Sequence, residues 1–415
     1  MLATLPLGAD ELSAWLRLAN ARGLKPAALC TLLGAFGLPQ HVFAQPFEAL
    51  AAAAGTEAAR AVLAPPAADF AQRVAAVAAW CALPGNALVT LADPAYPPRL
   101  LTMPDPPPLL YVKGRLDRLH ARSVAVVGSR SATPQALEDA TRFARTLATA
   151  GVTVVSGLAL GVDGAAHRGA LDESGGTVAV TGTGADLVYP PAHHALAVEI
   201  AARGAIVTEW PLGTPARPAN FPQRNRVIAA LVEGVIVVEA AMRSGSLITA
   251  RLANEMGRDV FALPGSVHAP LSRGCHRLIK EGAQLVETPE EVLEALRFTQ
   301  PAPRVRRTAA PREQSSRCAV TLPLEFEAQP SRLAQDRTEP PAQPPAKTAP
   351  ANAATLGTEA RALLDALGHA PATLEILAQR TDMTEAVLQA TLLQLELAGH
   401  VSALPGGRFT RASHY

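Results

Sequence analysis

The sequence has few aromatic residues and almost no excess of charge. Phe, Trp and Tyr make up 4% of the 415 residues, while hydrophobic residues make up 49%, which excludes a wholly disordered chain. Lys and Arg number 37 and Asp and Glu number 36, so the formal net charge is +1. Because the overall charge does not indicate a nucleic-acid partner, any such interpretation must rest on local groups of residues.

Cysteine is scarce as well, and its spacing argues against two kinds of site. The four cysteines, Cys30, Cys81, Cys275 and Cys318, lie far apart and form no Cys-x-x-Cys pair. This spacing fits neither a zinc site nor a disulfide framework. No apolar run reaches the roughly 20 residues of a membrane-spanning helix, and the N-terminus lacks the segments of a signal peptide. These absences predict a cytoplasmic protein without membrane insertion and without a bound metal.

The motifs of several enzyme classes are missing too. A dinucleotide site needs Gly-x-Gly-x-x-Gly after a strand, but Gly182-Thr183-Gly184 has no third glycine at that spacing. No lysine follows a glycine loop as it does in ATP-binding loops, and no Gly-x-Ser-x-Gly turn presents a serine nucleophile. We therefore expect no enzymatic activity, no catalytic residues and no cofactor.

The histidines do not supply a catalytic set either. Asp163 is well placed to cap a helix, and His167 then lies one turn inside that helix, where we expect it to make structural hydrogen bonds. His193 and His194 lie in a polar loop without a carboxylate at metal-binding spacing. We expect both of these side chains to be solvated.

Residues 123–287 alternate between short apolar runs and longer helical stretches. This alternation predicts an α/β fold with a doubly wound parallel sheet and helices on both faces. The expected strands are Ser123–Val127, Val152–Val155, Thr177–Thr181, Ala205–Thr208, Val235–Glu239, Val260–Leu263 and Gln284–Val286.

Small residues follow several of these strands, at the edge where an open α/β sheet builds its ligand site. The first strand ends in Gly128, Ser129 and Arg130. A glycine lets an anion approach the backbone closely, and an arginine offers a planar fork of donors. The fifth strand is followed shortly by Ser244-Gly245-Ser246. Recurrence of such residues at one edge predicts a bound ligand.

A second candidate stretch reads Phe-Pro-Gln-Arg-Asn-Arg at 221–226. Its two arginines, Arg224 and Arg226, flank Asn225, and guanidinium forks bind phosphates. Phe221 offers a face on which an unpaired base can stack. We expect this stretch to be a loop on the same sheet edge as the first turn.

An alternative for the two arginines of this stretch stays open. They can instead form ion pairs with Glu209 or Glu233 inside the fold. Taken alone, the stretch does not decide between these interpretations. Combined with the turn at 128–130 and the serines at 244–246, it favours the binding of a phosphate chain.

Other segments flank the predicted sheet. Residues 1–89 are expected to form an all-helical domain with a helix–turn–helix hairpin, which either packs structurally or binds the DNA backbone through the amides of its turn. Residues 90–298 form the core with a proline-rich lead-in, in which Leu109–Val112 adds a strand. Residues 299–355 are rich in proline and are expected to be a disordered linker.

Residues 356–415 are expected to form three helices and a hairpin, which is the pattern of a winged helix. The segment holds four arginines and six acidic residues, and its third helix carries no Lys or Arg. Because phosphate binding needs positive charge, a protein-contact or accessory role is favoured over the reading of DNA, which stays open as the alternative.

The ordered motifs of residues 90–290 resemble those of the bacterial DNA-processing protein A (DprA, also Smf) family. The motifs that carry the resemblance are Val-Val-Gly-Ser-Arg at 126–130, Ser-Gly-Leu-Ala-Leu-Gly-Val-Asp at 156–163 with His167, Gly-Thr-Gly at 182–184 with Tyr189-Pro190, Phe-Pro-Gln-Arg-Asn-Arg at 221–226, Ser-Gly-Ser-Leu-Ile-Thr-Ala at 244–250 and Pro264-Gly265. The N-terminal hairpin unit and the C-terminal winged helix look like those of many full-length members.

This resemblance implies a Rossmann-like core with an N-terminal helical domain of the SAM or helix-hairpin-helix kind and a C-terminal winged helix. It implies a homodimer that binds single-stranded DNA and loads the RecA recombinase onto it during natural transformation, without enzymatic activity. A Rossmann-like nucleotide hydrolase or nucleotide sensor is the alternative. The candidate DNA-binding residues are Gly128, Ser129, Arg130, Phe221, Arg224, Asn225, Arg226, Ser244, Gly245 and Ser246.

Overall fold

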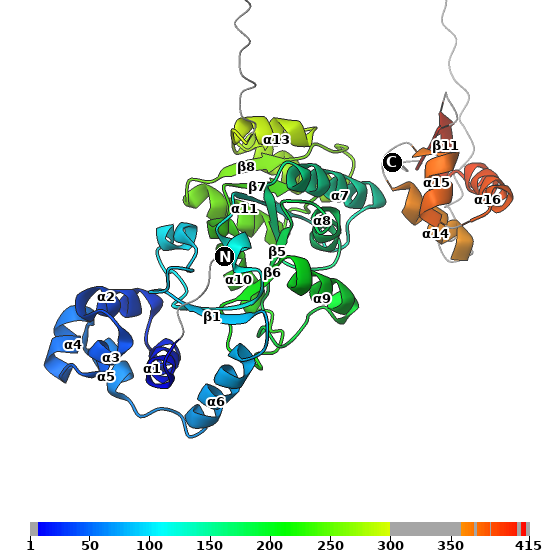
Figure 1. Ribbon diagram of the computed structural model, residues 1–415. Helices are drawn as coiled ribbons and strands as arrows, with labels where there is room; N and C mark the ends of the chain where they lie inside the picture. The colour runs from blue at the N-terminus through cyan, green and yellow to red at the C-terminus, as the bar shows by residue number, and fades with distance from the viewer. Residues whose placement is uncertain (1–6, 299–357, 369–371, 382, 405–407, 412–415) are drawn as a thin grey trace, which may run out of the picture. The chain divides into compact units, whose positions relative to one another are not determined.

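The computed structural model describes residues 7–298 and 358–411, apart from residues 369–371, 382 and 405–407 (Figure 1). The linker predicted at 299–355 lies outside the described residues. None of the helices in the described ranges combines the length and the apolar character that are needed to cross a membrane.

The N-terminal part of the chain is helical, as predicted. Leu12, Trp15 and Leu16 share a face of the first helix and are buried. Between the first two helices Gly23 has a φ of +82°, which glycine adopts without a steric penalty. The helices of this part are α1 (Ala9–Ala19), α2 (Pro26–Phe36), α3 (Pro39–Phe43), α4 (Phe47–Ala54), α5 (Thr56–Leu63) and α6 (Phe70–Cys81).

The central sheet has nine strands in the order β1-β2-β6-β5-β4-β3-β7-β8-β9. The seven predicted core strands are all present and parallel, and the added strand of the lead-in is confirmed as β2. An unpredicted strand, β1, pairs antiparallel with β2, which in turn pairs antiparallel with β6. The strands are β1 (Asn86–Thr90), β2 (Leu109–Gly114), β3 (Ser123–Val127), β4 (Thr153–Ser156), β5 (Thr177–Val180), β6 (Ala205–Thr208), β7 (Gly234–Val237), β8 (Asp259–Ala262) and β9 (Gln284–Leu285).

The chain runs outward from β3 in two directions. Strands β4, β5 and β6 follow on one side of β3, and β7, β8 and β9 follow on the other. A crevice forms at such a switch point, outside the carboxyl ends of the strands. Val127 at the end of β3 is in register with Val237 at the end of β7. The turns that follow these two strands therefore start side by side.

Alternate residues of each central strand pack on opposite faces of the sheet. In β3, Ala125 and Val127 face one hydrophobic cluster, with α10, α11 and α12, while Val124 and Val126 face the other, with α7, α8 and α13. Burial on both faces explains why the strand is uniformly apolar. The helices around the sheet are α7 (Pro134–Thr149), α8 (Val162–Ala170), α9 (His194–Arg203), α10 (Asn220–Leu231), α11 (Gly245–Glu255), α12 (Arg273–Lys280) and α13 (Pro289–Ala295).

The C-terminal unit is a winged helix, as predicted. Leu363, Leu377 and Leu388, one from each helix, are fully buried and form its small core. A short strand before the second helix, which the sequence pattern does not predict, completes a three-stranded antiparallel sheet. The elements are α14 (Thr358–Leu367), β10 (Ala372–Thr373), α15 (Leu374–Thr381), α16 (Glu385–Leu397), β11 (Val401–Leu404) and β12 (Arg408–Arg411).

Candidate nucleic-acid interface

A groove of about 840 Å³ lies at the switch point of the sheet, outside the carboxyl ends of β3 and β7. We call it the edge groove. It is lined by the turn after β3, the loop before α8, and the first turns of α10 and α11. Nine of the ten candidate residues line it, which are Gly128, Ser129, Arg130, Phe221, Arg224, Asn225, Ser244, Gly245 and Ser246.

The turn after β3 packs against the start of α8. Gly128 has no room for a side chain, because a Cβ there would lie 2.6 Å from Cγ2 of Val162. The glycine therefore permits close helix packing, in addition to any close approach of a ligand. Gly161 has a φ of +76° and packs against the carbonyl oxygen of Ser129, which accepts from the Val162 N–H at 3.2 Å. Arg130, at the end of this turn, is exposed.

The stretch 221–226 is helical, so the prediction of a loop before Val227 is wrong. Helix α10 begins at Asn220, and Pro222 stands in its first turn, where a proline costs no hydrogen bond. In a helix, residues three and four apart share a face. Phe221, Arg224 and Asn225 therefore point to one side of α10, toward the edge groove, and Arg226 points elsewhere.

Arg224 is part of the floor of the edge groove and is 4% exposed. Its guanidinium donates to the carbonyl oxygens of Gly157 and Val180, at the ends of β4 and β5. Burial lowers its pKa to about 10, so the group stays charged at neutral pH. The charge is opposed by the buried carboxylate of Asp163, whose pKa burial raises above its usual value although Arg224 partly offsets this shift.

Asp163 does not cap α8 as predicted, because Gly161 takes the N-cap position. The carboxylate instead turns back and accepts from the N–H groups of Gly157 at 3.1 Å and Ala159 at 3.3 Å. Together with Arg224 it fixes the loop between β4 and α8. This loop packs against the turn after β3. The buried pair therefore stabilises the backbone segments that line the edge groove.

Arg226 forms an ion pair with Glu209 and donates to the backbone carbonyl oxygen of Asp105 at 2.6 Å. Its side chain is 18% exposed. For Arg226 the alternative of an ion pair with Glu209 is thus confirmed. Glu233, the other acid considered, pairs with Arg99 and Arg122. Arg226 ties α10 to the proline-rich lead-in, and it does not line the edge groove.

The first turn of α11 forms the opposite wall of the edge groove. The Ser244 hydroxyl caps this helix by accepting from the Ser246 N–H at 3.3 Å, and the two serine hydroxyls lie 2.6 Å apart. The side-chain amide of Asn225 donates to the Gly245 carbonyl oxygen at 3.2 Å. A capped helix start directs free N–H groups and a partial positive charge toward the groove.

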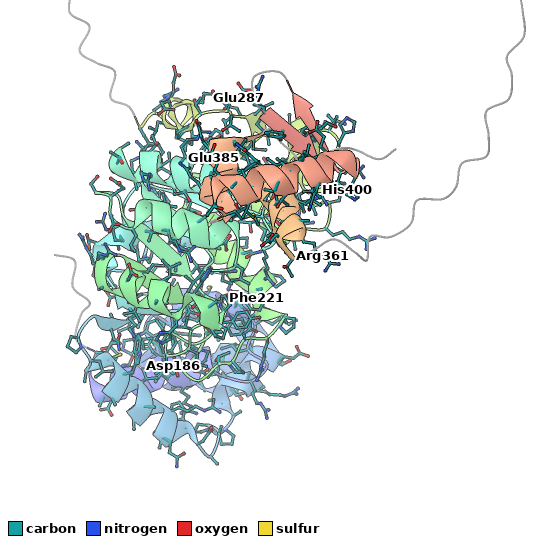
Figure 2. The ribbon with its side chains drawn as sticks, turned by 90° about the vertical axis from the view of Figure 1, so that its right-hand side faces the viewer. Asp186, Phe221, Glu287, Arg361, Glu385 and His400 are labelled. Atoms are coloured by element: carbon teal, nitrogen blue, oxygen red, sulfur yellow. The ribbon has the colours of Figure 1, made fainter. Side chains whose placement is uncertain are left out.

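Phe221, labelled in Figure 2, packs against other groups and is half-buried. A Cβ on Gly182 would lie 3.2 Å from its ring, so the ring rests on the end of β5. The Arg130 guanidinium lies 5.2 Å from the ring centroid, and the Tyr189 ring lies 5.6 Å away, tilted by 43°. The three planar groups thus lie next to one another among the residues that line the edge groove.

Two histidines fix the loop that precedes α8. Leu158 is fully buried and has a φ of +59°, which is uncommon for a residue with a side chain. Its N–H donates to Nε2 of His167 at 3.3 Å, and its carbonyl oxygen accepts from Nδ1 of His193 at 3.0 Å. The structural role of His167 is confirmed. The expectation that His193 is solvated is wrong, since it is 4% exposed, while His194 is exposed.

Arg243 and Tyr189 line the edge groove and were not among the candidates. Arg243 directly precedes the serine turn, so its place after the fifth strand could have pointed to it. Tyr189 lies nine residues after the end of the third core strand. No pattern in the sequence indicates that the loop between them returns to the sheet edge, so Tyr189 could not be predicted as a groove residue.

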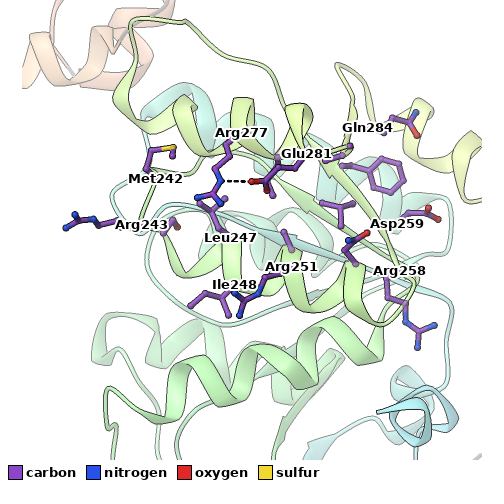
Figure 3. Close-up of a pocket in the computed structure, with 18 residues that line it drawn as sticks. Met242, Arg243, Leu247, Ile248, Arg251, Arg258, Asp259, Arg277, Glu281 and Gln284 are labelled. Atoms are coloured by element: carbon purple, nitrogen blue, oxygen red, sulfur yellow. Dashed lines mark hydrogen bonds and ion pairs between the residues drawn. The ribbon is translucent and has the colours of Figure 1, made fainter. Parts of the chain in front are cut away.

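A second cavity, of about 580 Å³, lies against α11, α12 and the start of β8 (Figure 3). Arginines stand around it, and Arg277 pairs across one helical turn with Glu281 at 2.7 Å. Of the ten candidate residues, Ser244 is the one that lines it. The predicted site residues therefore belong to the edge groove and not to this cavity.

Comparisons with known proteins agree with this assignment of the fold. Residues 87–297 match the model of the family described as DNA recombination-mediator protein A, and residues 343–407 match the DprA winged helix domain. Protein Smf of Escherichia coli (strain K12) is 40% identical over 341 residues, which are 81% of this chain and 80% of that protein.

DNA processing protein A of Streptococcus pneumoniae is similar to this chain both in sequence and in structure. The DNA processing protein DprA of this organism is 46% identical over 209 residues, which are 50% of this chain and 74% of that protein. The X-ray structure of DNA processing protein A from the same organism matches with a TM-score of 0.57 at 36% identity, and covers 68% of this chain and 97% of that chain. From its matched core and its identity to these relatives, this chain belongs to the DNA recombination-mediator protein A family.

Proposed function

We propose that this protein binds single-stranded DNA in the edge groove and acts as a recombination mediator. The observation that carries the proposal is the convergence of nine candidate residues from three distant segments at the switch point of the sheet. The groove offers backbone N–H groups, hydroxyls and exposed guanidinium groups. These are the groups that bind a sugar–phosphate chain.

The charge of the edge groove supports a polyanionic ligand. Three arginines and one aspartate are among its lining residues. The buried Arg224 is opposed by Asp163, which leaves Arg130 and Arg243 as exposed cations. In the described part of the chain, neither of these two forms an ion pair with a carboxylate. Their charge is therefore available to phosphates, and the binding free energy should depend strongly on salt.

The same contacts change the roles of two candidates. Arg224 and Arg226 are engaged with carbonyl oxygens and carboxylates of the fold, so we propose that they position the groove while Arg130, Arg243 and Asn225 contact the strand. Asp163, the carboxylate among the described groove residues, is occupied by two amides. This favours binding over the alternative of nucleotide hydrolysis.

Family membership supports the finer steps of the proposal. We propose that the protein assembles as a homodimer through its core, protects incoming single strands in the cytoplasm, and loads the RecA recombinase onto them during natural transformation. No cofactor is required for these steps. The winged helix serves contacts with protein, because its net charge is negative over residues 356–415.

Replacing both Arg130 and Arg243 with alanine is expected to weaken binding of single-stranded DNA by roughly 2–4 kcal/mol, since each arginine–phosphate contact is worth about 1–2 kcal/mol. The slope of log K against log salt should fall by about 0.7 for each phosphate that the variant no longer neutralises on a single strand. Titration of a labelled oligonucleotide over a range of salt concentrations measures both quantities.

Arg60→Ala is the matched control, since Arg60 is exposed on α5 and neither it nor its chain neighbours are among the groove-lining residues. It should bind nearly as the wild type does. Duplex of the same length should bind more weakly than the single strand. Equal affinity for duplex would contradict the proposed preference for single strands, and wild-type affinity of the double variant would show that the edge groove is not the DNA site.

Removing residues 301–415 is expected to leave the affinity for single-stranded DNA within a few-fold of the full chain. The reason is that the candidate groove residues all lie within 128–246, while the removed winged helix is acidic. The same titration on the truncated chain tests this. A complete loss of binding would place the DNA site on the C-terminal unit.

A further inference from the structure

We propose that Tyr189 is the residue of the edge groove on which an unpaired base stacks. This inference rests on the proposed function, because it assigns one contact of the same DNA-binding site. It differs from the sequence-based interpretation, in which Phe221 offers the stacking face.

Exposure distinguishes the two aromatic rings. Tyr189 is 45% exposed, whereas Phe221 rests on Gly182 and has Arg130 and Tyr189 beside its ring. A base needs a free aromatic face to stack on. Phe221 has much of its surface covered within the protein. Tyr189 lines the edge groove and keeps nearly half of its surface exposed.

The loop that carries Tyr189 is fixed at several points. The Thr183 hydroxyl donates to the Leu187 carbonyl oxygen at 2.9 Å, and the Asp186 carboxylate accepts from the Gly213 N–H at 2.9 Å. On the other side of the tyrosine, buried His193 donates to the Leu158 carbonyl oxygen. The loop is thus held in place before the ligand arrives, and the ring itself packs against Phe221, which reduces the entropy that binding costs.

The position of the ring also explains a preference for single strands. Bases in a duplex are stacked on both faces by their neighbours, so a protein ring stacks readily on a base that is unpaired or at a strand end. Arg130 also lies next to Phe221, with its guanidinium 5.2 Å from the ring centroid. We assign phosphate binding to Arg130 and base stacking to Tyr189.

The test compares Tyr189→Ala with Tyr189→Phe and with Leu187→Ala. Leu187 is 40% exposed in the same loop and does not line the groove, so it controls for changes in the loop itself. We expect Y189A to weaken binding of oligothymidylate by roughly 5- to 150-fold, in line with about 1–3 kcal/mol per stacked base. Y189F and L187A should bind within about two-fold of the wild type.

Two further readouts separate stacking from a structural role. The salt dependence of Y189A should equal that of the wild type, because the variant keeps every arginine that neutralises a phosphate. An abasic deoxyribose-phosphate strand of the same length should bind equally to Y189A and to the wild type. With Y189W, fluorescence of the new indole should be quenched at saturation with oligothymidylate, relative to the wild-type protein with its own tryptophans.

The inference is overturned if Y189A binds oligothymidylate like the wild type, or if it loses as much affinity for the abasic strand. A general loosening of the protein would appear as a lowered midpoint of thermal unfolding in Y189A and would also contradict the assignment. Failure of the proposed function looks different, because in that case the wild type itself shows no preference for single-stranded DNA.

Discussion

Replacing Arg224 with methionine is expected to lower the free energy of unfolding by about 3–5 kcal/mol, as is typical when one partner of a buried charge pair is removed. The methionine leaves the carboxylate of Asp163 buried without its cation. It also removes the donor to the carbonyl oxygens of Gly157 and Val180. Chemical denaturation of the variant and the wild type at neutral pH measures the difference.

A second substitution separates this charge effect from the change in packing. Asp163→Asn in the Arg224→Met background removes the buried charge, so the double variant should regain part of the lost stability. If Arg224→Met instead unfolds like the wild type but fails to bind single-stranded DNA, Arg224 is a direct phosphate contact, as the sequence alone predicts.

Lowering the pH from 6.5 toward 4 is expected to destabilise the protein through His167, by about 1.4 kcal/mol for each pH unit. Burial, with the charges of His193, Arg224 and Arg168 adding to it, lowers the pKa of His167 to about 3. In the unfolded chain the pKa is about 6.5. Between these values the unfolded chain binds a proton that the folded chain does not, so stability falls as the pH falls.

The measurement is the slope of unfolding free energy against pH for the wild type and for His167→Gln. Over pH 4–6 the slope of the variant should be smaller by up to about 1.4 kcal/mol per pH unit, which corresponds to the uptake of one proton. Asp163 acts in the opposite direction, because burial raises its pKa, and the comparison of two proteins removes its contribution. His194→Gln, at an exposed position, should leave the slope unchanged. Parallel curves for His167→Gln and the wild type would contradict the role given to His167.

Much of the fold could be predicted because each core strand is buried on both faces. Such strands are continuous runs of β-branched residues, as in Ser123–Val127, and these runs are visible without any knowledge of their neighbours. The two-residue strand β10 is too short to carry a clear pattern, whereas β9, which is equally short, could be predicted from a weak apolar run. Strand β1 escapes prediction because it follows a long helical segment and joins the sheet from outside the alternating region.

The location of the site could be predicted from the sequence, whereas the roles of its individual residues could be predicted less well. The turn at Gly128–Arg130 and the serines at 244–246 follow strands, and parallel strands end at one edge. Arg224 and Arg226 look alike in the sequence, yet Arg224 is buried in the floor of the groove and Arg226 pairs with Glu209. The two arginines differ because they point to different sides of α10. Six residues that include a proline do not show from sequence that this stretch is helical, so the side to which each residue points could not be predicted.

The pairing of β1 with β2 has a consequence for how the chain can be divided. Asn86–Thr90 covers one side of β2 from Asn86 opposite Lys113 to Thr90 opposite Leu109. A fragment that begins at residue 90 would leave the backbone N–H and C=O groups of β2 without partners on that side. Open strand edges of this kind recruit other chains and promote aggregation. A soluble core fragment must therefore begin before Asn86, inside the segment assigned from sequence to the N-terminal domain.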